Sequence, residues 1–425
     1  MTPREPIDIA VPGDKSLSHR ALIFAALAQG ESHISGILDS ADVRSTAECL
    51  RRLGVAVPPL AARMTIGGNT ARAFTNPRRD LDCGNSGTTT RLLAGVVAGA
   101  GRTARFIGDA SLSKRPMKRV SDLLTQMGAS VSFEAGDGLP MRIVGAPLRG
   151  IEYESTKSSA QIKSAVLLAG LTAGVRVRYA EPIASRDHTE RMLGALGAPV
   201  RTSANATTLE ASDGTLRAFT FDVPGDPSSA AFFAAWGALR GVPIRTNTIS
   251  VNATRVGFFD ALHRMGAEVE TTAGEMRCGE PVGRFVVTGT VKRAIALESR
   301  YVPGMIDELP LLACVGAYAS GETRVHGAAE LRVKESDRIT TVVNNLNAIG
   351  VHAEELPDGF VVRGERRALR GRVVTHGDHR IAMAFGILGA LPGNAIEIDE
   401  PGCVDVSFPT FWSELKRVGS DARAA

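Results

Sequence analysis

A short pattern of apolar and small residues recurs along the chain at a nearly constant interval. In Leu124-Thr-Gln-Met127-Gly128-Ala129 two apolar residues, three positions apart, precede a glycine and a small residue, and Leu262-His-Arg-Met265-Gly266-Ala267 repeats the arrangement. The pattern ends about every 70 residues, at the glycines Gly54, Gly128, Gly197, Gly266, Gly350 and Gly419. One copy would indicate only a common helix end. The series predicts repeated αβ units, in which each glycine caps a helix in the left-handed conformation before a strand such as Ala129–Phe133.

A second duplication divides the repeats into two groups. Val11-Pro-Gly-Asp14 recurs as Val223-Pro-Gly-Asp226, with three repeats between the copies and three after the second copy. This arrangement predicts an α/β protein of two lobes. One lobe comprises residues 14–224, and the other comprises residues 1–13 together with 225–425, so that the first dozen residues belong to the C-terminal lobe.

Composition narrows the class of protein. The 425 residues are 44% hydrophobic, and the net charge of +4 comes from 49 basic and 45 acidic residues that are mixed throughout. Without a long basic run, and with 5% aromatic residues, the chain is poorly supplied for binding nucleic acid. No apolar run approaches the length of a membrane span. The five cysteines are odd in number and form no CxxC pair, which favours neither disulfides nor zinc and indicates a reducing, cytoplasmic location.

Five apolar, helix-like runs each follow a cluster of small polar or basic residues. The clusters are Lys15–Arg20, Gly84–Arg91, Ser158–Lys163, Lys334–Arg338 and His376–Arg380. Helix N-termini bind anions, and neighbouring lysine or arginine adds charge-assisted hydrogen bonds. Any one cluster is equally typical of a helix cap with solvated charges. Together they predict small phosphorylated or carboxylated ligands.

Two of these clusters carry further candidate chemistry. Lys334 and Arg338 lie four positions apart and are expected to share a helix face near its start, with the carboxylates of Glu335 and Asp337 beside them, suited to proton transfer. The alternative is an ordinary salt-bridged surface helix. His376 and His379 lack a third ligand at a familiar spacing, so we expect no metal. No segment matches GxxxxGK[ST] or GxGxxG, so we expect no nucleotide cofactor.

The same residues carry a family resemblance that runs from end to end of the chain. The motifs are Pro12-Gly-Asp-Lys-Ser-Leu-Ser-His-Arg20, Gly84-Asn-Ser-Gly-Thr88, Lys114-Arg-Pro116, Leu331-Arg-Val-Lys-Glu-Ser-Asp-Arg338 and Asp378-His-Arg-Ile-Ala-Met383. They resemble the signatures of EPSP synthases (3-phosphoshikimate 1-carboxyvinyltransferases). Ser159-Ala-Gln161, Ser185-Arg-Asp-His-Thr189 and Met305-Ile-Asp-Glu308 resemble the class II branch. The resemblance implies a two-lobed, inside-out α/β barrel of six repeated βαβαββ units.

The resemblance also implies two substrates and their binding residues, with no cofactor. Shikimate 3-phosphate is expected to contact Lys15, Ser16, Arg20, Ser159, Ala160, Gln161, Arg186, Asp307 and Lys334. Phosphoenolpyruvate is expected to contact Lys15, Asn85, Gly87, Arg115, Gln161, Arg338 and Arg380. A lysine that first-branch members carry before Ser-Phe-Pro is replaced here by Val406, a further class II feature.

The implied reaction is addition followed by elimination, and both steps need proton transfer. Glu335 is the candidate acid at C3 of phosphoenolpyruvate, and Asp307 is the candidate base near the attacking 5-hydroxyl. Lys15 is a third candidate for either role, and the sequence does not apportion them. We expect a cytoplasmic monomer whose ligand clusters converge when the lobes approach each other.

Two other functions fit parts of the sequence. The UDP-N-acetylglucosamine enolpyruvyl transferases have a similar fold and the same donor, but they carry a reactive cysteine in the region that here reads Asp109–Pro116 without one. A non-catalytic, anion-binding relative would have little reason to keep both Asp307 and Glu335. Family members also bind glyphosate in place of phosphoenolpyruvate. Some class II members with alanine at the position of Gly87 tolerate it, so this chain is expected to be inhibited.

Overall fold

The computed structural model describes residues Glu5 to Ala424, which form two compact units. The N-terminal unit comprises Gly13–Val223 and Met276–Glu280, and the C-terminal unit comprises the residues up to Pro12, Pro224–Glu275 and the chain from Pro281 onward. Each unit has its own hydrophobic core. The sequence did not anticipate that the tip of a hairpin, Met276–Glu280, belongs with the N-terminal unit.

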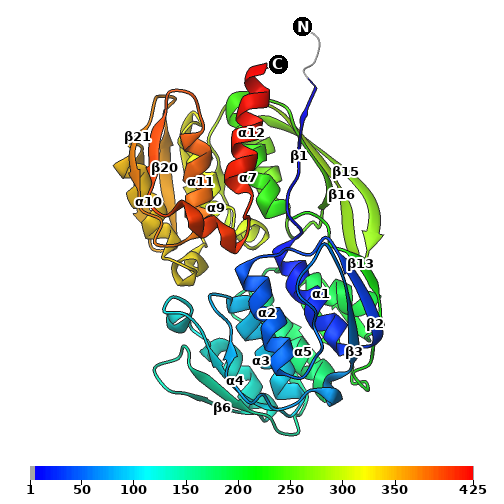
Figure 1. Cartoon of the computed structure of the whole chain (residues 1–425). Coiled ribbons are helices and arrows are strands. Elements are labelled where there is room, and N and C mark those ends of the chain that lie inside the picture. Colours follow the sequence, from blue (N-terminus) through cyan, green and yellow to red (C-terminus); the bar gives the residue numbers. More distant parts are fainter. Residues whose placement is uncertain (1–4, 425) are drawn as a thin grey trace. The chain divides into compact units, whose positions relative to one another are not determined.

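Three apolar helices form the centre of the N-terminal unit. They are α1 (Lys15–Leu27), α3 (Gly87–Gly99) and α5 (Ala160–Ala173) (Figure 1). Almost every residue of these helices after the first turn is buried, as expected for helices that are apolar on all sides. The more amphipathic helices α2 (Ala41–Arg52), α4 (Lys118–Met127) and α6 (His188–Ala195) bury one face each.

Three four-stranded sheets complete this unit. One has the order β4 (Leu81–Asp82), β5 (Thr103–Ile107), β7 (Met141–Val144) and β6 (Ser130–Phe133). Another has the order β10 (Val200–Ser203), β11 (Ala206–Leu209), β9 (Val177–Ala180) and β8 (Ile151–Glu154). In the third, β2 (Ala28–Ser35) pairs with β3 (Arg63–Asn69), β12 (Leu216–Arg217) and β13 (Thr220–Asp222). The first two sheets and their helices follow the predicted βαβαββ order.

The C-terminal unit also has three central helices and three sheets, but its third sheet has two strands instead of four. Its central helices are α7 (Pro227–Arg240), α9 (Leu309–Gly316) and α11 (His379–Gly389), and the others are α8 (Gly257–Arg264), α10 (Arg338–Ala348) and α12 (Phe411–Ala424). One sheet has the order β1 (Ile7–Ile9), β14 (Ile244–Ser250), β16 (Glu280–Gly289) and β15 (Ala267–Arg277). The second has the order β17 (Ala296–Leu297), β18 (Gly321–Val325), β20 (Gly359–Gly364) and β19 (His352–Leu356). The third pairs β21 (Arg370–Val373) with β22 (Ala395–Ile398).

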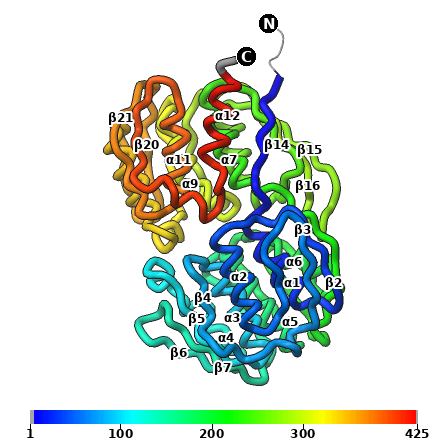
Figure 2. Tube along the Cα trace, in the orientation of Figure 1, coloured from blue at the N-terminus to red at the C-terminus, as the bar shows by residue number. Residues whose placement is uncertain are grey.

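In each unit, one sheet is assembled from segments that are far apart in the sequence. Strand β1 pairs in parallel with β14, with Ile7 opposite Ile244 (Figure 2). Strands β12 and β13, which end the N-terminal segment, pair in parallel with β2 near its beginning. In both units, therefore, strands that are about 190 residues or more apart in the chain lie side by side in one sheet.

The predicted glycine caps are confirmed with one exception. Gly54, Gly128, Gly197, Gly266 and Gly350 all have positive φ angles between 95° and 118°, at the ends of α2, α4, α6, α8 and α10. The prediction for Gly419 was wrong, because α12 continues through this position to Ala424. No strand follows α12 within the described residues, so the chain needs no reversal there.

Candidate active site

A buried arginine on α1 joins three segments of the N-terminal unit. Arg20 is 4% exposed and donates hydrogen bonds to Thr189 Oγ1 (2.8 Å), Ser164 Oγ (2.8 Å) and the Ser16 carbonyl (3.0 Å). These partners are all uncharged. Burial lowers the pKa of Arg20 to about 10, although nearby carboxylates, Glu190 foremost, partly oppose the effect. The guanidinium stays charged at neutral pH, and an anion bound beside it would offset its lost hydration.

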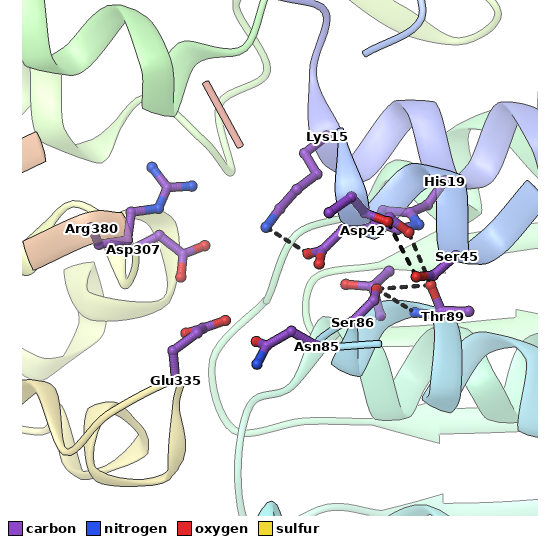
Figure 3. A network of polar contacts seen from close by, with 12 residues as sticks. Lys15, His19, Asp42, Ser45, Asn85, Ser86, Thr89, Asp307, Glu335 and Arg380 are labelled. Atoms are coloured by element: carbon purple, nitrogen blue, oxygen red, sulfur yellow. Dashed lines mark hydrogen bonds and ion pairs between the residues drawn. The ribbon is translucent and has the colours of Figure 1, made fainter. Parts of the chain in front are cut away.

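Lys15, the first residue of α1, is held by a carboxylate from α2. Its Nζ lies 3.1 Å from Asp42 Oδ2, and both side chains are largely buried (Figure 3). Asp14 precedes it as the N-cap, and its Oδ1 accepts the Leu17 N–H at 2.9 Å. The predicted helix start at Lys15–Arg20 is therefore confirmed, and the ammonium of Lys15 has a fixed direction.

Buried polar side chains connect α1, α2 and α3 behind Lys15. His19 Nδ1 lies 2.7 Å from Thr46 Oγ1, which lies 2.6 Å from Thr89 Oγ1. Thr89 in turn donates to Ser86 Oγ at 2.8 Å (Figure 3). Burial, together with the charges of Lys15 and Arg20, lowers the pKa of His19 well below its usual value, so this ring is neutral at pH 7. The network fixes the start of α3 relative to α1.

The loop Gly84–Thr88 leads into α3 and carries two of the residues expected to bind phosphoenolpyruvate. Ser86 is the N-cap of α3, so Gly87 is its first residue. Asn85 Oδ1 accepts a hydrogen bond of 2.5 Å from Arg115 Nη2, and Asn85 Nδ2 donates to Asp109 at 2.6 Å. Arg115 is 7% exposed. A loop amide, a helix N-terminus and an arginine thus lie together, as an anion site requires.

The start of α5 lies beside the same loop. Gln161 donates from Nε2 to Thr88 Oγ1 (2.9 Å) and accepts from Arg91 Nη1 (2.7 Å). Ala160 is the first residue of α5, and the side chain of its N-cap, Ser159, makes no capping hydrogen bond. The Ser159 hydroxyl is therefore not committed to the helix. The N-caps Asp14 and Ser86, by contrast, both use their side chains on the helices that follow.

In the C-terminal unit, the candidate acid and base are both bonded to one arginine. Arg338 is 2% exposed, and it donates to Glu335 Oε2 at 2.6 Å and to Asp307 Oδ1 at 3.3 Å. Its Nε and Nη2 also donate to the fully buried Asp378, at 2.8 and 3.2 Å. Burial alone lowers the pKa of Arg338, but Asp378, Glu335 and Asp307 together raise it above its usual value. Arg338 therefore orients both candidate proton-transfer groups.

The expectation that Lys334 and Arg338 share a helix face was wrong. Lys334 has an extended backbone and follows a short 3-10 helix, Ala329–Val333, whereas α10 begins at Arg338. The physical reason is Asp337, whose side chain accepts the Ile339 and Thr340 N–H groups, both at 3.2 Å, and thereby caps the helix. Lys334 still lies 3.7 Å from Asp307 Oδ1, so it approaches this carboxylate from a loop.

Arg380, in the first turn of α11, is a further buried cation among the candidate site residues of this unit. It is 5% exposed, its guanidinium carbon lies 6.0 Å from the ring centre of Phe232, and its backbone N–H is accepted by the N-cap Asp378 at 2.9 Å. Within residues 5–424 it forms no ion pair, so its charge is available to a bound anion. Figure 3 shows Arg380 with Asp307 and Glu335 of the same unit.

The structure thus gathers the predicted site residues within each unit. Lys15, Ser16 and Arg20 lie on α1, the Asn85 and Gly87 loop contacts Arg115, and Arg186 directly precedes Asp187, the N-cap of α6. Sequence reasoning missed Asp42, Arg91 and Asp378 as organising residues, because an acid or arginine in the first turns of a helix is common on any surface. Within the described chain no group of three His, Cys, Asp or Glu side chains is placed to hold a metal ion, and no helix there is long and apolar enough to cross a membrane.

Comparisons with known proteins agree on one family. The family model of EPSP synthase (3-phosphoshikimate 1-carboxyvinyltransferase) matches residues 6–415. The 3-phosphoshikimate 1-carboxyvinyltransferase of Sulfurihydrogenibium sp. is 43% identical over 416 residues, 96% of each chain, and that of Gloeobacter violaceus is 44% identical over 417 residues, 97% of this chain and 96% of its own. The solved EPSP synthase of Acinetobacter baumannii is 37% identical with a TM-score of 0.83, over 97% of this chain and 95% of its own. Sequence and fold together place this chain in the EPSP synthase family.

Proposed function

We propose that this protein transfers the enolpyruvyl group of phosphoenolpyruvate to the 5-hydroxyl of shikimate 3-phosphate, releasing phosphate. The observation that carries the proposal is that two carboxylates, those of Asp307 and Glu335, both accept hydrogen bonds from Arg338 at the start of α10. Membership of the EPSP synthase family supports the same reaction. A non-catalytic binding protein has no use for two carboxylates oriented by one buried cation.

The reaction proceeds in two steps that need opposite proton transfers. The 5-hydroxyl oxygen adds to C2 of phosphoenolpyruvate and loses its proton, while C3 gains a proton and becomes a methyl group. The tetrahedral product then loses a C3 proton and expels phosphate, which regenerates the double bond. Both carboxylates are suited to proton transfer, because each side chain is 18% exposed and is held by Arg338. We assign the hydroxyl proton to Asp307, which also lies near Lys334, and C3 to Glu335. Lys15, held by Asp42, is the third group able to move a proton.

Shikimate 3-phosphate binds chiefly to the N-terminal unit. Its phosphate is a dianion near neutral pH, and the buried Arg20 with its uncharged partners is suited to receive it beside Lys15 and Ser16. The uncommitted hydroxyl of Ser159 supports the same assignment, with Ala160 and Gln161 at the start of α5 and Arg186 before α6. In the C-terminal unit, Asp307 and Lys334 serve the acceptor hydroxyl.

Phosphoenolpyruvate binds to arginines and to one helix start. Arg115, Asn85 and Gly87 lie at the N-terminus of α3, where free N–H groups and a guanidinium favour an anion. Arg380 and Arg338 supply the remaining positive charge, and Gln161 and Lys15 serve both substrates. The arginines oppose the charge that develops on the departing phosphate.

The protein acts as a cytoplasmic monomer, with Gly13–Val223 and Met276–Glu280 in one unit and the rest of the described chain in the other. The free thiols of Cys49, Cys83 and Cys314, which are buried, fit a reducing compartment.

Release of inorganic phosphate tests the proposal directly. Purified protein with both substrates should release phosphate in amounts equal to the enolpyruvyl product, and omission of either substrate should stop the release. UDP-N-acetylglucosamine replaces shikimate 3-phosphate in a parallel reaction and should give no phosphate. Release with that acceptor alone would favour the related transferase, and binding of both substrates without any release would favour a non-catalytic relative.

A further inference from the structure

The buried carboxylate of Glu181 lies where two segments of the N-terminal unit meet. Glu181 follows β9, and its side chain is 1% exposed. Its Oε2 accepts the Ser159 N–H at 3.2 Å, and its Oε1 accepts the Ser185 N–H at 2.7 Å. The Ser185 hydroxyl lies 2.8 and 2.9 Å from the two oxygens. One carboxylate therefore joins the residue that caps α5 to the residue that precedes Arg186.

Glu181 is fixed from the other side by a buried lysine of α5. Lys163 Nζ lies 2.7 Å from Glu181 Oε1 and 2.8 Å from Glu190 Oε1, and these side chains are 5%, 1% and 3% exposed. Burial lowers the pKa of Lys163, but the carboxylates of Glu190 and Glu181 raise it by more than burial lowers it. The net shift is upward, so the ammonium remains charged. Glu190 also acts on Arg20, where it opposes the loss of charge. Two cations thus balance two carboxylates.

Stability alone does not account for this arrangement. Buried ion pairs are often no more stabilising than apolar residues of the same size, because desolvating the charges is costly. Glu181 has a second property that an apolar residue lacks, because its oxygens accept N–H groups from two loops. Ser159 lies 22 residues before Glu181 in the chain, and Ser185 lies 4 residues after it. A further hydrogen bond of 3.2 Å, from the Ile183 N–H to Ser158 Oγ, joins the same two loops.

We propose that Glu181, held in place by Lys163, is a positioning residue for recognition of shikimate 3-phosphate. It sets the separation between the Ser159–Gln161 segment and the segment that carries Arg186, so that both reach one ligand. The inference rests on the proposed substrate. Glu181 itself touches no substrate, and the loss of its contacts should weaken binding of shikimate 3-phosphate while leaving the proton-transfer groups in place.

Two variants that remove the same charge beside the same lysine test this proposal. In Glu181→Gln the amide NH2 cannot accept an N–H, so one of the two loops loses its anchor. Glu190→Gln is the matched control, because Glu190 contacts Lys163 and Thr207 but no N–H of either loop. We expect Glu181→Gln to raise Kd and KM for shikimate 3-phosphate at least tenfold. Its kcat, with both substrates saturating, should change less than threefold, because Asp307 and Glu335 keep their contacts with Arg338.

Glu190→Gln also removes a carboxylate that acts on Arg20, but Asp14 and Glu280 still act on that guanidinium. Glu190→Gln should therefore not raise the Kd for shikimate 3-phosphate more than threefold, whatever it does to the melting temperature. Glu181→Asp retains the charge with a shorter reach, and it should also weaken binding, which covers the case in which Glu181→Gln does not fold. Equal effects of the glutamine variants at 181 and 190, or wild-type binding by Glu181→Asp, would overturn the proposal. A wild type that neither binds shikimate 3-phosphate nor releases phosphate would instead overturn the proposed function.

Discussion

Replacing Gly87 by alanine should separate glyphosate from phosphoenolpyruvate. Gly87 is the first residue of α3 and does not have a positive φ angle, so its backbone conformation is open to alanine. This removes the simplest alternative, that the glycine is needed only for a tight turn. A β-carbon built there lies 2.7 Å from Arg91 Nη1 and 3.5 Å from Arg115 Nη1, and it approaches no backbone atom as closely.

The cost to the fold is small because two effects oppose each other. Alanine in place of glycine stabilises by about 0.4–1 kcal/mol through the unfolded chain. The end of Arg91 must move, and its 2.7 Å hydrogen bond to Gln161 is lost or weakened, at about 1.5–3 kcal/mol for a charged donor. We therefore expect Gly87→Ala to fold, with a net loss of stability of about 0.5–2.6 kcal/mol.

The effect on ligands depends on their length. A methyl group that intrudes on a filled site costs about 1–3 kcal/mol, which corresponds to a 5- to 150-fold weaker affinity. Glyphosate is longer than phosphoenolpyruvate and should bear this cost, whereas the KM for phosphoenolpyruvate should rise less than threefold. The measurement is KM for phosphoenolpyruvate and Ki for glyphosate, in phosphate release by wild type and Gly87→Ala.

Arg91→Met is the control, because it removes the bond to Gln161 without adding a β-carbon at position 87. It should change KM and Ki in parallel. The steric reasoning is refuted by parallel changes in Gly87→Ala, by a wild type that is already insensitive to glyphosate, or by a selective rise of Ki in Arg91→Met.

The remaining predictions concern proton transfer, the buried arginine, metals and pH. Asp307→Asn and Glu335→Gln should each lower kcat by about 10²–10⁴ while the substrates still bind in calorimetry, and near wild-type kcat in both would disprove their roles. Arg338→Ala leaves the buried Asp378 without its cation and should lower the urea-derived free energy of unfolding by about 3–5 kcal/mol; a loss below 1 kcal/mol would contradict this. EDTA should leave the rate of phosphate release unchanged, and a rate restored only by a divalent ion would show a metal requirement. The lowered pKa of His19 means that its contribution to stability is complete above about pH 6.5 and is lost below it, by up to about 1.4 kcal/mol per pH unit. The free energy of unfolding in urea should therefore fall less steeply with pH in His19→Gln than in the wild type, and equal slopes would contradict this.

The sequence was sufficient to predict the helix starts, because each combines two independent signals. A polar cluster followed by an apolar run marks α1, α3, α5 and α11, and Asp14, Ser86 and Asp378 cap three of them through their side chains. Where two signals competed, the prediction failed. The spacing of Lys334 and Arg338 suited a helix, but the stronger cap, Asp337, lies between them.

Contacts between distant segments were beyond the sequence. Asp42 reads as an ordinary first-turn acid of α2, and nothing in the chain indicates that it meets Lys15. Glu181 reads as the end of a strand, and its approach to Ser159 and Lys163 depends on how β9 packs beside α5. Motifs identify residues that touch ligands, whereas the residues that hold them are found only in three dimensions.

The pairing of β1 with β14 has a consequence for the order in which the two units can fold during synthesis. Asp8 on β1 forms its ion pair with Arg245, which is 237 residues further along the chain. At roughly 5–20 residues per second, a ribosome takes about 12–50 s to synthesise that interval. Throughout this time β1 has no partner, whereas the N-terminal unit acquires β12 and β13 and most of its core. The C-terminal unit must therefore recruit a strand that left the ribosome first. In a chain that begins after Pro12, the N-terminal unit should still fold, whereas the C-terminal unit should lack β1 and leave one edge of β14 unpaired.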